Sequence, residues 1–452
     1  MGGCKSLPIE RRGGKEEKHT RNSSSLEQIT PAGNPELKAK MASVTMQGTA
    51  SLPKGARAGY IGLQNLGNTC FMNSALQCLS HTQPLTEYFL YCEWRSEINI
   101  ENPLGMKGKL AESYGALVTK MWRGHSKVLS PNQFKNIVGQ WAPQFAGYDQ
   151  HDSSELLTFL LDGLHEDLNR VTKKPYVEDV ECGDRPEELV AAESWRNYLL
   201  RNKSIVVDLF QGQLRSKLTC TKCLYSRIKF DPFMYLSVPV PKTHEALTLD
   251  DCLREFTAEE DLTKDDQWYC PKCKDFRDAK KKFDLWKVPP VLLVCLKRFE
   301  YSEDGRRRKI EREINFPVDQ PWSLSDHVKS PQREKPSYTL FAVANHHGGY
   351  GGGHYTAYAK HHENNEGWYL YNDKTYKKVK DAQTEVKSAD AYVLMYQQMV
   401  TVKKGGMYRR QTISLPHLWP HMVGVEESAG RSSIFRPSEL KLKKAMSDPS
   451  VG

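Results

Sequence analysis

The sequence predicts one large α+β domain over residues 59–397, between two tails that we expect to be disordered. The first observation is a series of leucines from Leu156 to Leu168, spaced as on one face of a helix. The second is the strand-like alternation that fills the end of the region, from Tyr338 to Tyr396. The third is a pair of Cys-x-x-Cys motifs, which can share one metal ion only if the fold brings distant segments together.

The composition is that of a globular protein. The chain has 452 residues, of which 39% are hydrophobic and 26% are charged. No apolar run is long enough to span a membrane, and the first residues lack the apolar core of a secretory signal. We therefore expect a cytoplasmic protein whose eleven cysteines are thiols or metal ligands rather than disulfides.

The positive charge is concentrated in the tails. The whole chain has a formal net charge of +9, and residues 1–58 and 398–452 carry +5 each. The region between them is therefore nearly neutral, with a net charge of −1. Because nucleic-acid-binding domains usually present a basic surface, we expect no nucleic-acid partner for this region.

The N-terminal tail, residues 1–58, is rich in Gly, Ser, Lys and Glu and shows no periodicity. Its first six residues fit the pattern M-G-x-x-x-[ST] for N-myristoylation of Gly2. Cys4 could take a palmitoyl chain, and two acyl chains anchor a protein stably where one does not. The tail thus predicts peripheral association with the plasma or endosomal membrane, against the alternative of a chance Met-Gly start.

The first helix is expected at Cys70–Leu79, after a turn rich in Gly and Asn. Asn68 and Thr69 are residue types that cap helices, which places Cys70 in the first helical turn. Backbone N–H groups and the helix dipole should lower the pKa of a thiol there and favour the nucleophilic thiolate. The same N–H groups, with the side chain of Asn65, could hold an oxyanion. The alternative is a buried structural cysteine.

Further segments have helical patterns. Pro84–Tyr91 continues the first helical region, and Ser130-Pro131-Asn132 opens another helix. Asp152 and Glu155 precede the leucine-rich helix as a variant of the capping box. The functional alternative for this acidic pair is contact with a basic segment of a substrate. Residues 171–204 are charged and helix-prone, and we assign them no chemistry.

Strands are expected in two groups that are bounded by short polar segments. The second group closes the domain as a strand-rich end. The first group comprises Ser216–Thr219, Phe233–Val240, Phe283–Leu285 and Val291–Leu296, and the second comprises Tyr338–Ala344, Tyr355–Ala359, Trp368–Tyr371 and Ala391–Tyr396.

The two Cys-x-x-Cys motifs predict a structural zinc site. Cys220 and Cys223 form one pair of ligands, and Cys270 and Cys273 form the other. Four thiolates complete a tetrahedral Zn²⁺ site and leave no open position for a catalytic water. The alternative is four unrelated thiols. Because the pairs lie far apart in the sequence, we expect the site between two strand pairs.

A glycine-rich loop precedes the second candidate catalytic residue, His354, which begins a strand. A catalytic base must reach the nucleophile and be oriented by a third group. Asn372 and Asp373 end the next strand, so antiparallel pairing would place one of them beside His354. His346 and His347 precede the glycines and are expected to lack an equivalent partner.

The C-terminal tail, residues 398–452, shows no periodicity and is expected to be disordered. Within it, Arg409 to Pro416 resembles a site for a basophilic kinase. A phosphate there could create a docking motif for a phospho-dependent partner, whereas the alternative is a merely solvated segment.

Together these motifs resemble the ubiquitin-specific protease family of deubiquitinating cysteine peptidases, over about residues 59–397. The resemblance implies a papain-like core described as thumb, palm and fingers, with Zn²⁺ in the fingers at about residues 208–300. The matching segments are the Cys70 turn, Gly353-His354-Tyr355, Asn372-Asp373, both Cys-x-x-Cys pairs, residues 147–155, Phe210-Gln211-Gly212 and Pro289 to Phe299.

The resemblance also implies a role for each candidate catalytic residue. Cys70 would be the nucleophile and His354 the general base. Asn372 would orient the imidazole, with Asp373 as a helper or substitute. Asn65 would be the side-chain donor to the oxyanion.

The implied substrate is ubiquitin joined to other proteins, cut after its C-terminal glycine at an isopeptide or peptide bond. Asp152 and Glu155 match positions that meet the arginines near the end of ubiquitin. Gly353 and Tyr355, on either side of the candidate base, are the other expected substrate-binding residues. Ubiquitin and ubiquitinated proteins are thus the expected partners.

Two other function classes remain open at this point. One is a catalytically silent scaffold that binds ubiquitin. The other is a zinc-ribbon module that binds nucleic acid through a basic face, for which the lysines near the cysteine pairs give the only support. These are Lys222, Lys272, Lys274 and Lys280–Lys282.

Overall fold

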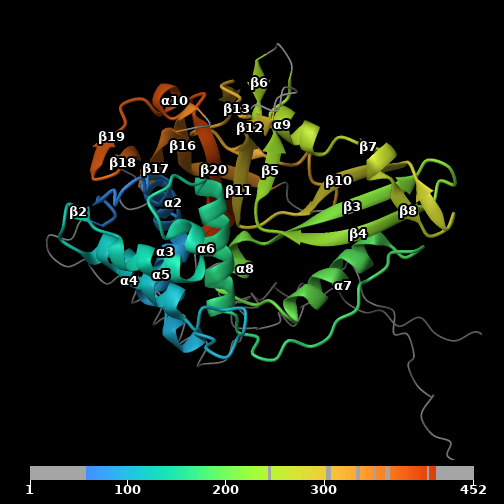
Figure 1. Cartoon of the computed structure of the whole chain (residues 1–452), viewed down its shortest axis with the longest axis horizontal. Coiled ribbons are helices and arrows are strands. Elements are labelled where there is room, and N and C mark those ends of the chain that lie inside the picture. Colours follow the sequence, from blue (N-terminus) through green and yellow to red (C-terminus); the bar gives the residue numbers. More distant parts are fainter. Residues whose placement is uncertain are drawn as a thin grey trace, which may run out of the picture.

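The computed structural model describes residues 58–242, 246–301, 307–331, 336–349, 352–361, 367–404 and 407–413. Gly2 and Cys4, the predicted lipidation residues, lie outside the described residues. Figure 1 shows a group of helices at one end, a large sheet in the middle and a long narrow sheet toward the other end. Among the described helices, none combines the length and the apolar character that crossing a bilayer requires.

The helical end is built around α2 (Cys70–Ser80), whose eleven residues are all buried. The predicted first helical region is in fact two helices, because His81 and Thr82 interrupt it. The leucines of the predicted amphipathic helix are buried, as expected. The other helices of this end are α3 (Gln83–Tyr91), α4 (Lys109–Arg123), α5 (Asn132–Trp141), α6 (Ser153–Asp167) and α8 (Ile205–Phe210).

The central sheet contains nine strands of the described residues, and it confirms the strand-rich end. Its path is β19 (Thr375–Lys378), β18 (Gly367–Asn372), β17 (Gly352–His361), β16 (Ser337–Gly349), β20 (Ala391–Lys404), β11 (Val291–Lys297) and β5 (Leu236–Pro239). Two strands lie off this path: β15 (Trp322–Ser323) pairs with β16, and β21 (Met407–Thr412) pairs with β20. Among the described pairings of this central sheet, only that of β11 with β5 is parallel.

The sequence patterns predict that the domain ends at residue 397, but the structure continues it further. Strand β20 continues to Lys404, and β21 pairs with it up to Thr412. Ile413 then packs into the core at 7% exposure. The predicted kinase site therefore begins inside a paired strand, and its residues from 414 onward lie outside the described part of the chain.

The narrow sheet has the order β4–β3–β10–β7 and extends away from the helices (Figure 1). Helix α7 (Glu187–Leu199), from the helix-prone segment, packs Val190 and Ala191 against Phe230 and Trp286. The strands are β3 (Gly212–Cys220), β4 (Ser226–Phe233), β7 (Glu260–Leu262) and β10 (Ala279–Lys287), and β8 (Trp268–Cys270) pairs with β9 (Asp275–Arg277) nearby.

Shorter elements complete the described chain. Three are two-stranded pairings, and the others are short helices. They are β1 (Gly62–Leu63) with β2 (Val128–Leu129), β6 (Leu247–Thr248) with β14 (Ile314–Asn315), β12 (Phe299–Tyr301) with β13 (Arg307–Lys309), α9 (Leu249–Phe256), α10 (Ala382–Glu385), η1 (Trp94–Glu97), η2 (Pro143–Phe145) and η3 (Lys264–Asp266).

A buried carboxylate joins two of the helices that surround α2. Asp167, the last residue of α6, is fully buried. It accepts backbone N–H groups at the start of α4, from Met106, Gly108, Leu110 and Ala111, at 2.6 to 3.1 Å. A helix start leaves such N–H groups without internal partners, and a negative charge there is favourable.

Replacement of Asp167 by Ala should lower the free energy of unfolding by at least about 4 kcal/mol, because it leaves four N–H groups without this acceptor and each such buried group costs of order 1–3 kcal/mol. Urea denaturation of the two proteins measures the difference. The control is Asp149→Ala, which removes an exposed carboxylate. If the Asp167→Ala protein were as stable as the control, the assignment of Asp167 as the acceptor at the start of α4 would be contradicted.

Candidate active site and candidate metal centre

Cys70 begins α2. Asn68 and Thr69, which the sequence predicts to be caps of this helix, make no side-chain cap bond to it. Thr69 makes no side-chain cap bond, and its Oγ1 instead accepts the backbone N–H of Leu66 at 2.8 Å. Asn68 has a positive φ of 54°, and its Nδ2 donates to the carbonyl oxygen of Tyr148 at 2.8 Å. Both residues therefore shape the turn before Cys70, and Asn68 ties it to a distant loop.

The thiol of Cys70 is buried, with 1% of the residue exposed. Burial raises its pKa above the ordinary value of 9.0, and the negative charge of Asp373 raises this pKa further. Hydrogen bonds from the backbone N–H groups of Tyr355, Phe71 and Cys70 itself each lower the pKa by less than burial raises it, and the net pKa is raised. The predicted lowering is therefore wrong for the protein without substrate, because desolvation disfavours the thiolate. Such a thiol needs a base beside it.

His354 lies on β17, one residue before the Tyr355 that faces the sulfur. Its Nε2 is 2.8 Å from Oδ1 of Asn372, at the end of β18. Antiparallel pairing of β17 with β18 brings the two together, as expected. Since an amide oxygen only accepts hydrogen bonds, Nε2 carries the hydrogen, and Nδ1 is the nitrogen that can exchange a proton with a thiol.

Asp373, next in the chain, contacts different residues. Its Oδ2 accepts from Nδ2 of Asn65 at 3.0 Å, and its Oδ1 accepts from Nδ2 of Asn73 at 2.7 Å. Of the two candidates that the sequence leaves open, Asn372 therefore contacts the imidazole. Asn73 is a site residue that the motifs do not single out, although it lies one helical turn after Cys70, and that spacing was the available signal.

The carboxamide of Asn65 is fixed at both ends. Its Oδ1 accepts the backbone N–H groups of Gly67 at 3.0 Å and Thr69 at 3.1 Å. Its Nδ2 gives one hydrogen to Asp373. An amide nitrogen carries a second hydrogen, which is the one that could meet an oxyanion.

The glycines before His354 continue two paired strands rather than form the predicted loop. Gly348 pairs with Gly353, and residues 350–351 lie outside the described residues. A Cβ atom at Gly353 would lie 2.4 Å from Nε2 of His346, so only glycine fits there. Of the expected substrate-binding residues, Tyr355 is buried and Gly353 is half-buried.

The prediction that His347 lacks an orienting partner is wrong. Its Nδ1 is 2.8 Å from Oδ2 of Asp390, and its Nε2 is 3.0 Å from Oγ1 of Thr356. His346 is buried with its ring 4.6 Å from that of Tyr355, and burial lowers its pKa to about 4. The residue directly before Tyr355, whose N–H faces the Cys70 sulfur, is His354 rather than either of these two histidines.

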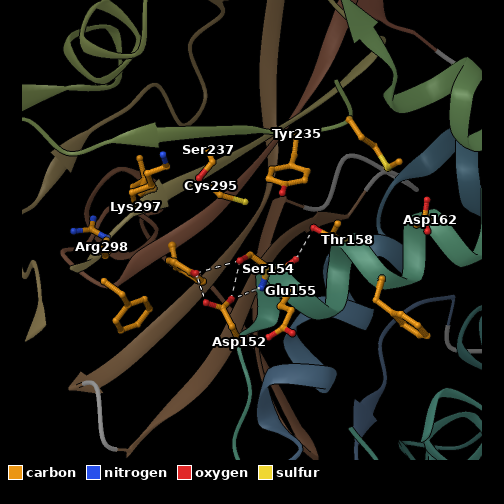
Figure 2. Close-up of a pocket in the computed structure, with 15 residues that line it drawn as sticks. Asp152, Ser154, Glu155, Thr158, Asp162, Tyr235, Ser237, Cys295, Lys297 and Arg298 are labelled. Atoms are coloured by element: carbon orange, nitrogen blue, oxygen red, sulfur yellow. Dashed lines mark hydrogen bonds between the residues drawn. The ribbon is translucent and has the colours of Figure 1, made fainter. Parts of the chain in front are cut away.

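Asp152 and Glu155 line a cavity of about 580 Å³ beside the start of α6. In Figure 2 they lie across this cavity from Tyr235, Ser237 and Cys295. Asp152 caps α6, because its Oδ1 accepts the N–H of Ser154 at 2.7 Å, and its Oδ2 accepts the hydroxyl of Tyr392. Glu155 is exposed, and among the described hydrogen bonds none returns from it to Asp152, so the predicted capping box is half formed.

Four cysteines converge at the far end of the narrow sheet and could hold a metal ion. The Sγ atoms of Cys220, Cys223, Cys270 and Cys273 all lie within 4.8 Å of one another. Two of the separations are 4.0 and 3.5 Å. Tetrahedral thiolates at about 2.3 Å from Zn²⁺ lie roughly 3.8 Å apart, so the donor set fits this ion.

Three of the six lysines near this centre, Lys280–Lys282, face acidic partners. Lys280 lies 2.6 Å from Glu259, and Lys281 lies 3.5 Å from Glu260. These pairs reduce the positive charge on which the nucleic-acid alternative depends.

The sequence profile of the ubiquitin carboxyl-terminal hydrolase family matches residues 61–396. The chain belongs to this family. Ubiquitin carboxyl-terminal hydrolase 9 of Arabidopsis thaliana is 29% identical over 607 residues, covering 77% of this chain and 66% of the relative. Ubiquitin carboxyl-terminal hydrolase 4 of Mus musculus is 58% identical over 183 residues, covering 40% of this chain and 19% of the relative. The chain thus spans just under two thirds of the plant relative and about a fifth of the mouse relative.

Solved structures show the same fold. A chain of the SAGA Ubp8/Sgf11/Sus1/Sgf73 DUB module bound to ubiquitin aldehyde matches with a TM-score of 0.61 and 25% identity. The match covers 81% of this chain and 76% of that chain. The predicted papain-like α+β fold is confirmed, and we call the α2–α6 end the thumb, the nine-stranded sheet the palm and the β3–β10 sheet with β8 and β9 the fingers.

Alkylation of Cys70 by iodoacetamide should depend on pH differently with and without His354. In the wild-type protein, proton transfer to the imidazole should allow reaction near neutral pH. In His354→Ala, the rate should rise only above pH 9.0, because burial raises the pKa of the isolated thiol. Mass spectrometry of the Cys70 peptide measures the rate, with His347→Ala as the control. Identical profiles for wild type and His354→Ala would contradict a Cys70–His354 pair.

Proposed function

We propose that this protein hydrolyses the isopeptide or peptide bond after the C-terminal glycine of ubiquitin, with Cys70 as the nucleophile. One arrangement carries the proposal: the buried thiol faces the N–H of Tyr355, directly after a histidine whose Nε2 is 2.8 Å from Asn372. Membership of the family and a solved relative bound to ubiquitin aldehyde support ubiquitin as the substrate.

In the first half of the reaction, Nδ1 of His354 takes the proton of the Cys70 thiol. The sulfur attacks the carbonyl carbon of the terminal glycine, and the carbonyl oxygen takes the negative charge. The imidazolium then protonates the departing lysine amine as the C–N bond breaks, which leaves a thioester. Asn372 binds Nε2 of the ring, which leaves Nδ1 to exchange the proton with the sulfur.

In the second half, water attacks the thioester and gives a proton to His354. The C–S bond breaks, the thiolate recovers the proton from His354, and ubiquitin leaves with a carboxyl group that loses its remaining proton to the solvent. Because burial disfavours a lone thiolate, the sulfur gives up its proton readily only with the base beside it.

The oxyanion of both halves would receive the second N–H of Asn65. We assign Asp373 as the residue that positions this amide, because its carboxylate binds the first N–H. Loss of one such donor typically costs about 2.7–4 kcal/mol of transition-state stabilisation. This assignment gives adjacent residues, Asn372 and Asp373, separate tasks in one site.

Recognition of the arginines near the end of ubiquitin is assigned mainly to Glu155. Its carboxylate is exposed at the cavity beside α6, whereas the oxygens of Asp152 already accept hydrogen bonds from Ser154 and Tyr392. Asp152 then contributes negative charge and the position of the helix start. Gly353 and Tyr355 line the path along which the substrate's terminal glycines pass.

The metal centre is assigned to structural Zn²⁺, held by Cys220, Cys223, Cys270 and Cys273. Bound Zn²⁺ would cross-link the β3–β4 turn to the β8–β9 turn, since each turn supplies one Cys-x-x-Cys pair. The described cysteines are free thiols, so disulfides do not compete for these ligands.

The N-terminal pattern supports a further proposal, that Gly2 and Cys4 are acylated and hold a cytoplasmic protein on the plasma or endosomal membrane. Labelling of wild type and Gly2→Ala with a myristate analogue checks it. The segment from Arg409 supports phosphorylation and a phospho-dependent partner only weakly, since Ile413 is buried within it.

A catalytically silent ubiquitin-binding scaffold is the second candidate function. The raised pKa of Cys70 is the observation that favours it. A scaffold would bind ubiquitin without turnover and would not be trapped by a ubiquitin-derived electrophile.

Turnover of a fluorogenic ubiquitin C-terminal amide should disappear in Cys70→Ala and fall by roughly 10²–10⁴-fold in His354→Ala, because the general base is lost. His347→Ala should retain most of the wild-type rate, since its ring contacts Asp390 and Thr356 instead. Hydrolysis by Cys70→Ala would disprove the nucleophile. If the wild-type protein binds ubiquitin but shows no turnover, the result would support the scaffold function instead.

Zinc content should drop from one ion per chain to none in Cys273→Ser, and the melting temperature should fall because the fingers lose a cross-link. Atomic emission and calorimetry on the purified proteins measure both. Cys182→Ser, which removes a buried thiol outside the metal centre, should keep the ion. Equal zinc content in the two variants would contradict the assignment.

A further inference from the structure

One loop, residues 146–150, contacts the segments that directly precede the two residues of the proposed catalytic pair, through Asn68 and Gly353. The buried Lys135 of α5 fixes this loop by donating to two of its carbonyl oxygens, at 3.0 and 2.7 Å. The carbonyl oxygen of Tyr148 accepts from Asn68, two residues before Cys70. We name residues 146–150 the bridge loop.

At its other end, the bridge loop reaches the strand that carries His354. Nε2 of Gln150 donates to the carbonyl oxygen of Gly353 at 2.5 Å, and the N–H of Gly353 donates to Oε1 of Gln150 at 3.0 Å. One carboxamide thus takes both backbone groups of the residue directly before His354. It does so from a loop 203 positions away in the sequence.

Gly353 is held from the opposite side by the palm. It pairs with Gly348 of β16, and its Cα lies so close to His346 that no Cβ would fit. Between β16 and Gln150, the backbone before His354 therefore has little room to shift.

The side chain of Gln150 can bind the backbone of Gly353 because this part of β17 is a free strand edge. Pairing of β17 with β18 is described only from Ala357 onward, so Gly353 and Tyr355 present their backbone groups to the thumb. Alternate residues of a strand point the same way. Gly353 is taken by Gln150, and Tyr355 faces the Cys70 sulfur, so the carboxamide and the thiol are neighbours along one edge.

We propose that Gln150 is a positioning residue for His354, which acts by fixing the backbone of Gly353. This inference rests on the proposed function. Gln150 is exposed, so its side chain adds little to the apolar core, and its described hydrogen bonds go to Gly353. A displacement of about 1 Å in a reacting group can cost roughly 10²-fold in rate.

Gln150→Met tests the proposal, because methionine keeps the length of the side chain and removes both hydrogen bonds. With a fluorogenic ubiquitin C-terminal amide, kcat should fall about tenfold while KM stays within about twofold. Gln144→Met, which changes an exposed glutamine just before the bridge loop, should leave both parameters unchanged. Melting temperatures check that both variants fold.

A second measurement needs no ubiquitin. Alkylation of Cys70 by iodoacetamide at neutral pH should slow in Gln150→Met, in the same direction as in His354→Ala. If His354→Ala slows alkylation and Gln150→Met does not, the inference fails and the proposed function stands. If His354→Ala has no effect either, the proposed function fails.

Three kinetic results would overturn the inference. A rise in KM as large as the fall in kcat would make Gln150 a substrate-binding residue. Equal losses in Gln150→Met and Gln144→Met would reflect the loop alone. A faster Gln150→Met enzyme would show that the contact holds the cleft shut.

Discussion

The packing of α2 against the edge of β17 is the contact on which this site depends. All eleven residues of α2 are buried, so its first residue, Cys70, is desolvated together with the rest. The same burial that stabilises the helix raises the pKa of the thiol. Fold and chemistry are therefore coupled: the nucleophile is held rigidly, but its thiolate is disfavoured unless a proton acceptor lies beside it.

Polar side chains from β18 and from the turn after it contact both sides of this α2–β17 interface. Asn372 ends β18 and contacts the imidazole of His354, whereas Asp373 has a φ of 45° and turns toward the amides of Asn65 and Asn73. The left-handed backbone at Asp373 begins the two-residue turn that joins Asn372 of β18 to Thr375 of β19. Asn372 can thus contact the imidazole of His354, while its neighbour Asp373 contacts Asn65 and Asn73 on the α2 side of the cleft.

Local patterns predicted the elements whose signals lie within one segment. The leucines of α6 and its Asp152 cap were predicted because spacing and capping are properties of a short window. The extension through β20 and β21 was missed, since a basic, polar strand at a sheet edge lacks the apolar alternation of a buried one. The cap of α2 was also mispredicted, because Asn68 bonds instead to Tyr148, a partner 80 positions away.

The sequence by itself determined the residue types of the site: a cysteine at a helix start, a histidine at a strand start, an amide-acid pair at the next strand end and two cysteine pairs. Motif order was enough for this, because each motif is short and chemically specific. Only the tertiary structure decided that Asn372 rather than Asp373 contacts His354, that His347 has its own carboxylate, and that the pKa of Cys70 rises. These outcomes depend on distances and burial between segments far apart in the chain, which no local pattern encodes.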